Sequence, residues 1–157
     1  MAAHVIFRSY SRSEREACLS LFDANCPEYF APNERNDYAN FLDTNPAGYE
    51  LCIVNDQVVG AFGLIVNNTL RRSLKWIMLN PQSQGLGIGS AVMARVSTLA
   101  IAAKLEAVDI AASHKSAPFF AKFGAVTTGI IQDGWGPGMH RVDMALSIQR
   151  PNNSFTP

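Results

Sequence analysis

Neither sign of charge is in excess in this sequence of 157 residues, because 13 Lys and Arg residues balance 13 Asp and Glu residues. The basic residues are scattered along the chain rather than gathered in runs. A protein that binds nucleic acid normally presents a basic face to the phosphates. We therefore expect no nucleic-acid partner.

Cysteine is scarce, and long apolar runs are absent. Cys18, Cys26 and Cys52 are odd in number and lack Cys-x-x-Cys spacing, so we expect neither a disulfide framework nor a metal site. No run approaches the roughly 18 apolar residues of a membrane helix, and the segment MAAHVIFRSYSRSERE lacks the apolar core of a secretory signal. These absences predict a cytoplasmic protein with reduced thiols and no membrane partner.

Apolar residues are plentiful, at 48% of a length that suits one globular domain. We expect this domain at residues 1–150 and a disordered tail at 151–157. Residue patterns predict strands at 4–10, on both sides of Asn55-Asp56 within 49–66, and at 73–79, 107–112, 125–132 and 142–149. They predict helices after the capping-box pair Ser11 and Glu14, around Tyr38, Phe41 and Leu42, and over 88–104 and 117–124, and a loop at 133–141. The order β-α-α-β-β-β-α-β-α-β-β indicates a mixed α/β single domain.

One glycine-rich stretch, NPQSQGLGIGS at residues 80–90, lies between a predicted strand and a predicted helix. It could be an ordinary turn. A dinucleotide-binding turn requires Gly-x-Gly-x-x-Gly, whereas Gly85, Gly87 and Gly89 alternate strictly, which disfavours a nucleotide-dependent oxidoreductase. The phosphate loop of nucleotidases is excluded because Gly-Lys-Ser/Thr is missing.

A third interpretation rests on the form Gln/Arg-x-x-Gly-x-Gly/Ala, which Gln84 to Gly89 match. Backbone N–H groups at a helix start have no intrahelical acceptor and carry a partial positive charge, so they favour a pyrophosphate. A Cβ atom at Gly87 or Gly89 would hold the anion away from these donors. This interpretation predicts an anion site at residues 84–89.

Two motifs resemble those of a known family. WIMLNPQSQGLGIGSA (Trp76–Ala91) resembles the acetyl-CoA motif of the GNAT superfamily of N-acetyltransferases, and SHKSAPFFAKFGA (Ser113–Ala125) resembles its second signature. The resemblance spans about residues 4 to 149 and implies a mixed, mostly antiparallel sheet flanked by helices. It implies an enzyme that moves an acetyl group from the co-substrate acetyl-CoA to a primary amine of a small molecule or peptide by direct attack. A homodimer is a further expectation, because relatives often dimerise.

The same resemblance assigns residues to the coenzyme. The backbone of Ile77, Met78 and Leu79 would bond the pantetheine arm, although an ordinary core strand would show the same side chains. The backbone amides of a second set would wrap the pyrophosphate: Gln84, Gly85, Leu86, Gly87, Ile88 and Gly89. Ser113 and Phe120 align with family positions beside the coenzyme.

Phe120 also departs from the family pattern, because many relatives carry a Tyr there as the presumed general acid. Phe has no proton to donate, so the acid role stays open, and a non-catalytic acyl-CoA-binding module is the alternative function. Glu34 and His140 are the catalytic candidates. Glu34 could instead be a solvated carboxylate in the first turn of a helix, and His140 could be merely an exposed loop residue. The remaining proton-handling candidates are His114, Asp133, Asp143 and Tyr38. Tyr29, Phe30 and Trp135 could form the walls of an acceptor pocket or cover the core.

Overall fold

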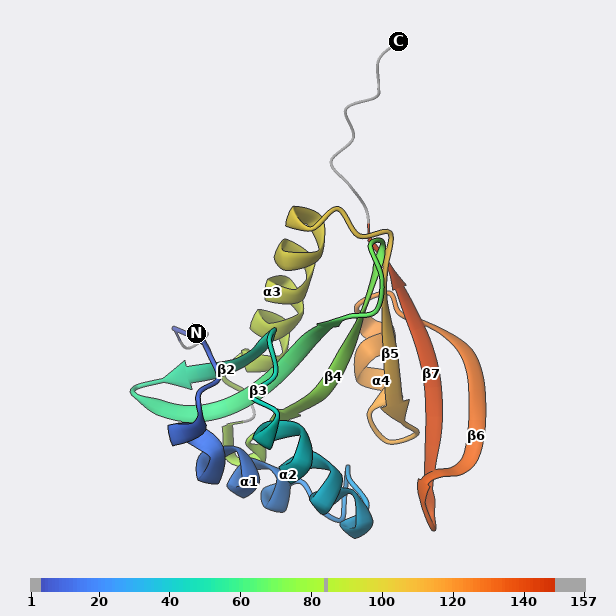
Figure 1. Ribbon diagram of the computed structural model, residues 1–157. Coiled ribbons are helices and arrows are strands. Elements are labelled where there is room, and N and C mark those ends of the chain that lie inside the picture. Colours follow the sequence, from blue (N-terminus) through green and yellow to red (C-terminus); the bar gives the residue numbers. More distant parts are fainter. Residues whose placement is uncertain (1–3, 84, 149–157) are drawn as a thin grey trace.

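The computed structural model describes residues 4–83 and 85–148, which form a seven-stranded sheet flanked by helices (Figure 1). The strands lie in the order β1-β2-β3-β4-β5-β7-β6, and every neighbouring pair is antiparallel except β4 and β5. Their bounds are β1 Ile6–Ser9, β2 Tyr49–Val54, β3 Gln57–Val66, β4 Arg71–Leu79, β5 Ala107–Ser113, β6 Val126–Gly136 and β7 Met139–Ser147. The predicted fold class is confirmed.

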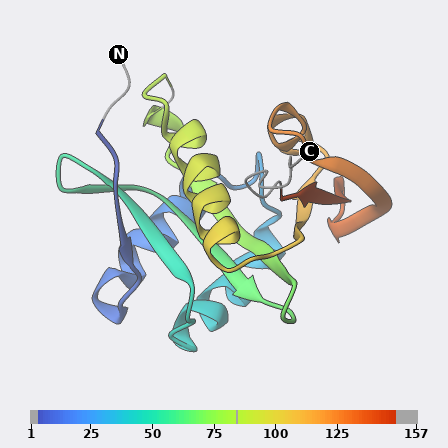
Figure 2. The same ribbon diagram turned by 90° about the horizontal axis from the view of Figure 1, so that it is seen from above.

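Four α-helices in the described part of the chain cover the two faces of the sheet: α1 Arg15–Ala24, α2 Arg35–Asp43, α3 Ile88–Ala102 and α4 Ala117–Lys122. Seen from above, α3 lies on one face and the α1–α2 pair on the other (Figure 2). Each face therefore has its own hydrophobic core, one built on α3 and α4 and the other on α1 and α2. None of the described helices is long and apolar enough to cross a membrane.

The hydrophobic spacing of α3 predicted its buried face well. Ile88, Val92 and Val96 are at most 3% exposed, and Leu99 packs against the same core. The turn between β2 and β3 also follows its sequence signal, because Asn55 and Asp56 have φ angles of 50° and 63°. Both residues tolerate this left-handed geometry, which a two-residue hairpin turn requires.

Two local predictions were wrong. Ser11 makes no capping bond: its hydroxyl pairs with Ser13, and Glu14 forms an ion pair with Arg8 instead of reaching back to Ser11. The loop expected at 133–141 is mostly strand, because β6 continues to Gly136 and β7 begins at Met139. The glycines there serve a tight connection between two paired strands, which composition alone does not distinguish from a loop. The expected tail at 151–157 lies outside the described residues.

A β-bulge interrupts the pairing of β3 with β4. Lys75 pairs with Gly63 and Met78 with Ala61, so two residues of β4, Trp76 and Ile77, lie opposite one residue of β3. Trp76 has a φ of 49°, a conformation that is unusual for a large side chain. A bulge bends its strand and increases its twist, so β4 changes direction at Trp76.

Buried tyrosines hold this bulge in place. The Tyr49 hydroxyl donates to the Trp76 carbonyl oxygen at 2.7 Å and pairs with the Tyr38 hydroxyl, also at 2.7 Å. Both tyrosine side chains are almost fully buried, and burial raises the pKa of each hydroxyl well above its ordinary value. The core under α1 and α2 therefore fixes the path of β4 through a chain of neutral hydrogen bonds.

Candidate functional site

The parallel strands β4 and β5 pair over only four residues of each, Arg71–Leu74 with Ala107–Ile110. Beyond Leu74 and Ile110 the two strands diverge, as their lower halves do in Figure 1. A cavity of about 890 Å³ occupies this opening. It is lined by the free parts of both strands, the start of α3, α4, the segment between α1 and α2, and the end of β6.

The glycine turn forms one end of the cavity. Gly85 has a φ of 85°, and no atom lies within 4 Å of the place that a Cβ atom would take. Gly87, the N-cap of α3, has a φ of 76°, and the first backbone N–H groups of α3 have no intrahelical acceptor. Left-handed glycines at an open helix start fit an anionic group such as a diphosphate.

Not every residue assigned to the pyrophosphate occupies this end. Gly85, Gly87, Ile88 and Gly89 line the cavity, whereas the exposed Leu86 does not. The Leu86 N–H group already donates to the Ser83 carbonyl oxygen at 3.4 Å. Gln84 lies outside the described residues.

Gly89 is required for packing. A Cβ atom at Gly89 would lie 2.8 Å from the Phe119 ring and 3.4 Å from the Leu79 side chain. The contact with the Phe119 ring is too close, whereas the Leu79 distance is an ordinary contact, so a glycine allows α3 to approach α4. This reason differs from the expected one, in which a Cβ atom at Gly89 would hold off the anion.

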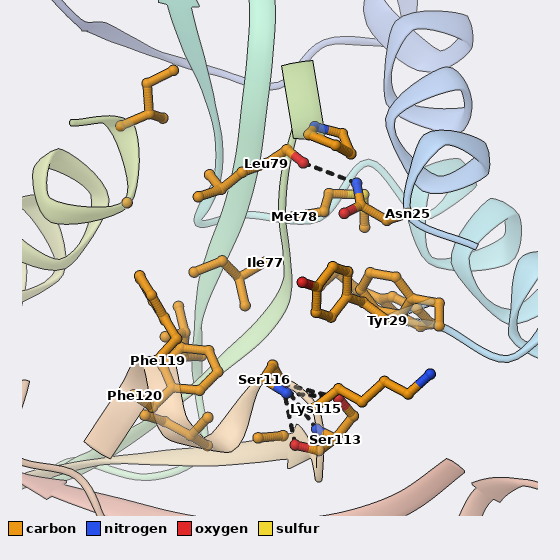
Figure 3. A pocket seen from close by; sticks show the side chains of 18 of the residues that line it. Asn25, Tyr29, Ile77, Met78, Leu79, Ser113, Lys115, Ser116, Phe119 and Phe120 are labelled. Carbon is orange, nitrogen blue, oxygen red and sulfur yellow. Dashed lines mark hydrogen bonds between the residues drawn. The ribbon is translucent and has the colours of Figure 1, made fainter. Parts of the chain in front are cut away.

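The wall from β4 consists of Ile77, Met78 and Leu79. Met78 is buried in the core under α1 and α2, whereas Ile77 and Leu79 pack against the core under α3. The Leu79 carbonyl oxygen accepts a hydrogen bond from the Asn25 side chain at 3.0 Å (Figure 3). Past its last pairing with β5, this strand offers its edge to a ligand rather than to another strand.

The opposite wall comes from α4 and the end of β5. Phe120 is 3% exposed and lines the cavity, so the position where relatives carry a Tyr is filled by an apolar ring. Ser113 also lines the cavity, but its hydroxyl lies 3.1 Å from the Ser116 hydroxyl and accepts from the Ser116 N–H group. These bonds fix the start of α4 and leave Ser113 less able to bind a ligand than its alignment suggests.

The other end of the cavity combines aromatic side chains with one carboxyl group. Tyr29, Phe30 and Glu34 come from the segment between α1 and α2, and Trp135 comes from β6. The Trp135 indole N–H donates to the Ala112 carbonyl oxygen at 2.9 Å, which ties β6 to the free end of β5. Tyr29, Phe30 and Trp135 therefore line the cavity, and Phe30 also packs against the core under α1 and α2, so both interpretations hold for Phe30.

Glu34 is a buried acid in this cavity. Its side chain is 5% exposed, and its Oε2 atom accepts a hydrogen bond from the Ala31 N–H group at 2.8 Å. Burial raises the pKa of Glu34 to about 7; the Ala31 bond opposes this rise and the charge of Asp37 adds to it. The expected alternative, a solvated carboxylate, does not hold, and Glu34 changes charge near neutral pH.

His140 is not brought into the cavity. Its Nδ1 atom accepts from the Asp133 N–H group at 3.0 Å, and its own N–H group donates to Nδ1 of His114 at 3.1 Å. The two imidazole rings pack with centroids 4.7 Å apart. These histidines connect β6, β7 and the end of β5, and neither of them lines the cavity.

Sequence patterns did not identify the structural roles of Asn25 and Trp76. Asn25 is 5% exposed and bonds both the Leu21 carbonyl of α1 and the Leu79 carbonyl of β4, at 2.8 and 3.0 Å. The only signal was its position directly after a helix, where Asn is common for local reasons. Nothing in the sequence marks Trp76 as a bulge residue, because aromatic residues favour ordinary strands.

The family model of the acetyltransferase (GNAT) family matches residues 17–125 of this chain. This span is more than half of the sequence, and the chain belongs to that family. No curated protein matches closely enough to count as a relative. The predicted class of enzyme, an acetyltransferase of the GNAT family, is confirmed.

Solved structures share the fold at low sequence identity. Ard1 from Thermoplasma volcanium has a TM-score of 0.79 at 15% identity, over 93% of this chain and 99% of that chain. The ribosomal-protein-S18-alanine N-acetyltransferase from Escherichia coli has a TM-score of 0.76 at 13% identity, over 96% and 98%. An aminoglycoside 6'-N-acetyltransferase complexed with coenzyme A has a TM-score of 0.72 at 13% identity, over 94% and 99%.

Proposed function

We propose that this enzyme acetylates a primary amine of a small molecule or peptide, with the coenzyme bound at the glycine turn and the amine at the aromatic end. The observation that carries the proposal is the opening between β4 and β5. It joins the open glycine turn at Gly85, which precedes the start of α3, to a buried carboxyl at Glu34 through one continuous cavity. Acetyl-CoA supplies the activated acyl group.

The protein's own groups then have separate tasks. Backbone N–H groups at Gly85, Gly87 and Ile88 hold the diphosphate, and the free edge of β4 at Ile77 holds the amide-bearing arm. Correct placement of two reactants can lower a barrier by on the order of 7–11 kcal/mol. The Glu34 carboxylate accepts the proton that the attacking amine loses, and a pKa of about 7 suits this task near neutral pH.

A matched pair of glycine variants tests the diphosphate site. Gly85 and Gly138 both have left-handed φ angles, 85° and 76°, and both have open space where a Cβ atom would lie. Ala at either position costs similar backbone strain. We expect Gly85→Ala to weaken acetyl-CoA binding at least about tenfold by calorimetric titration, because a weakened charge-assisted bond is worth that much.

Gly138→Ala, in the turn between β6 and β7, should bind acetyl-CoA as the wild type does. Equal affinity of wild type and both variants would place the diphosphate elsewhere. Release of free thiol across a panel of primary amines then identifies the acceptor, and its absence with every amine would favour the acyl-CoA-binding module.

We infer that the enzyme works in the cytoplasm. Free thiols at Cys18, Cys26 and Cys52 support a reducing compartment, which fractionation of cells that express the tagged protein would test.

We also infer that the enzyme is a homodimer. On the edge strand β6, the Val126 side chain is 66% exposed and the Ile130 side chain 69% exposed, which supports pairing of two copies there. Light scattering should report a dimer for the wild type and a monomer for Ile130→Lys; a monomeric wild type contradicts the dimer.

A further inference from the structure

We propose that the hydroxyl of Tyr29 protonates the departing sulfur of the coenzyme, a role that Phe120 cannot serve. This inference rests on the proposed function, because it requires the coenzyme to lie between β4 and α4. It assigns the acid to the segment between α1 and α2, on the opposite side of the cavity from Phe120.

The first support is the direction of the side chain. Tyr29 lines the cavity, and its hydroxyl points across the cavity toward Ile77, whereas Phe119 and Phe120 lie on the far side (Figure 3). The hydroxyl therefore faces the opening through which the thioester has to pass. Within the described residues it has no hydrogen-bond partner, which leaves its proton available to a ligand.

The second support is the way in which Tyr29 is held. Its backbone N–H group donates to the Asn25 carbonyl oxygen at 2.8 Å, and the Asn25 side chain is tied to Leu79 of β4. The neighbouring Phe30 ring packs against Phe22 and Trp76, with centroids 5.1 and 6.0 Å away. Tyr29 is thus fixed relative to the wall along which the pantetheine arm is proposed to lie.

The third support is that other proton donors of the lining are engaged, point elsewhere or, like Ser83 and Ser90, belong to the glycine-turn end. Ser113 and Ser116 bond each other at the start of α4. Tyr38 and Tyr49 are buried under the sheet and hold the bulge. Lys115 directs its ammonium group away from Ile77 (Figure 3).

The proton balance of the step is complete. The amine nitrogen forms a bond to the acyl carbon, the carbon–sulfur bond breaks, and its electron pair moves to sulfur. Tyr29 gives its hydroxyl proton to that sulfur and regains one from solvent. Glu34 takes the proton that the amine loses, so an amide and a free thiol result.

The test measures a property of bound coenzyme A that needs no acceptor. The pKa of its thiol is followed by the ultraviolet absorbance of the thiolate across pH, in wild type and Tyr29→Phe, each saturated with coenzyme A. A hydroxyl that donates to sulfur stabilises the thiolate. We therefore expect the bound thiol to have a pKa about one unit higher in the variant.

Tyr10→Phe is the matched control, because its hydroxyl is buried without a partner among the described residues and does not line the cavity. It should leave the pKa of the bound thiol unchanged. Equal pKa values in wild type and Tyr29→Phe would overturn the role of Tyr29. If the wild type failed to bind coenzyme A in calorimetry, the proposed function itself would fail, so the two failures are distinguishable.

Turnover with an amine from the panel shows whether Tyr29 acts as a general acid or only forms part of the cavity wall. Tyr29→Phe keeps the ring, so a wall residue would leave kcat unchanged. We expect kcat to fall about 100-fold with the KM for acetyl-CoA unchanged, the loss typical of a missing general acid. An unchanged kcat would contradict the proposal.

Discussion

The two ends of the cavity are built from different materials. The donor end, at the glycine turn and the free edge of β4, consists of backbone groups from one short stretch of chain. The acceptor end consists of side chains from separate elements, with Tyr29 and Glu34 before α2 and Trp135 on β6. A backbone site needs a local run of glycines, whereas a side-chain site needs several distant segments to meet.

This difference explains why the donor end can be predicted from the sequence and the acceptor end cannot. It also implies that the two ends can be damaged separately. Changes at the acceptor end should lower turnover while the coenzyme still binds, and changes in the strand between the ends should affect both. The first of the following variants tests this separation, and the others test the burial of Glu34 and the support of the strand.

The largest expected effect comes from Glu34→Gln at the acceptor end. The amide cannot accept the amine's proton, so we expect kcat to fall at least about 100-fold while the affinity for acetyl-CoA stays the same. In the wild type, kcat/KM should rise with pH through about 7 as Glu34 ionises. Glu28→Gln, at an exposed position in the same segment, is the control and should be fully active. A comparable loss of coenzyme affinity in Glu34→Gln would break the separation of the two ends.

Glu34 should also make the stability of the protein depend on pH. Its pKa is about 7 in the folded protein against an ordinary 4.5, so between these values the folded state binds more protons than the unfolded state. The free energy of unfolding therefore falls as pH rises from 4.5 to 7, by up to ~3 kcal/mol from this residue. Denaturant titrations should show that Glu34→Gln gains stability over wild type as pH rises through this window. A constant difference between the two proteins would contradict the burial of the carboxyl.

A smaller effect is expected from Tyr49→Phe, which alters the strand shared by both ends. The variant leaves the Trp76 carbonyl and the Tyr38 hydroxyl without their partner, so we expect a loss of about 2 kcal/mol in the free energy of unfolding. Tyr10→Phe removes a hydroxyl without a partner among the described residues and should be neutral or slightly stabilising. Denaturant midpoints measure both, and equal stability of the two variants would show that the bulge needs no support from Tyr49.

The elements of the fold and the donor turn were predictable because their signals are local. Helical spacing identified the buried face of α3, and the Asn55-Asp56 pair identified the hairpin turn. The opening between β4 and β5 was not visible, because it adjoins a bulge at Trp76 whose carbonyl oxygen is bonded by Tyr49 from β2. Long-range contacts of this kind leave no periodicity in the chain.

The catalytic candidates show the same limit. Glu34 and His140 were equally plausible from their types, yet the structure buries one in the cavity and bonds the other to β6 and His114. Gly89 shows that a motif position can be found for one reason and used for another, because its missing side chain makes room for Phe119. Position in space, rather than residue type, separates these cases.

The bulge at Trp76 has a consequence for the thermodynamics of binding. The gap beside β4 is held by buried tyrosine hydrogen bonds rather than by a loop that would have to become ordered. Association then avoids an entropic penalty of about 0.5–1.5 kcal/mol for every side chain that would otherwise be immobilised. Such preorganisation lets a small domain hold a long, flexible coenzyme in one position while acceptor molecules bind and dissociate.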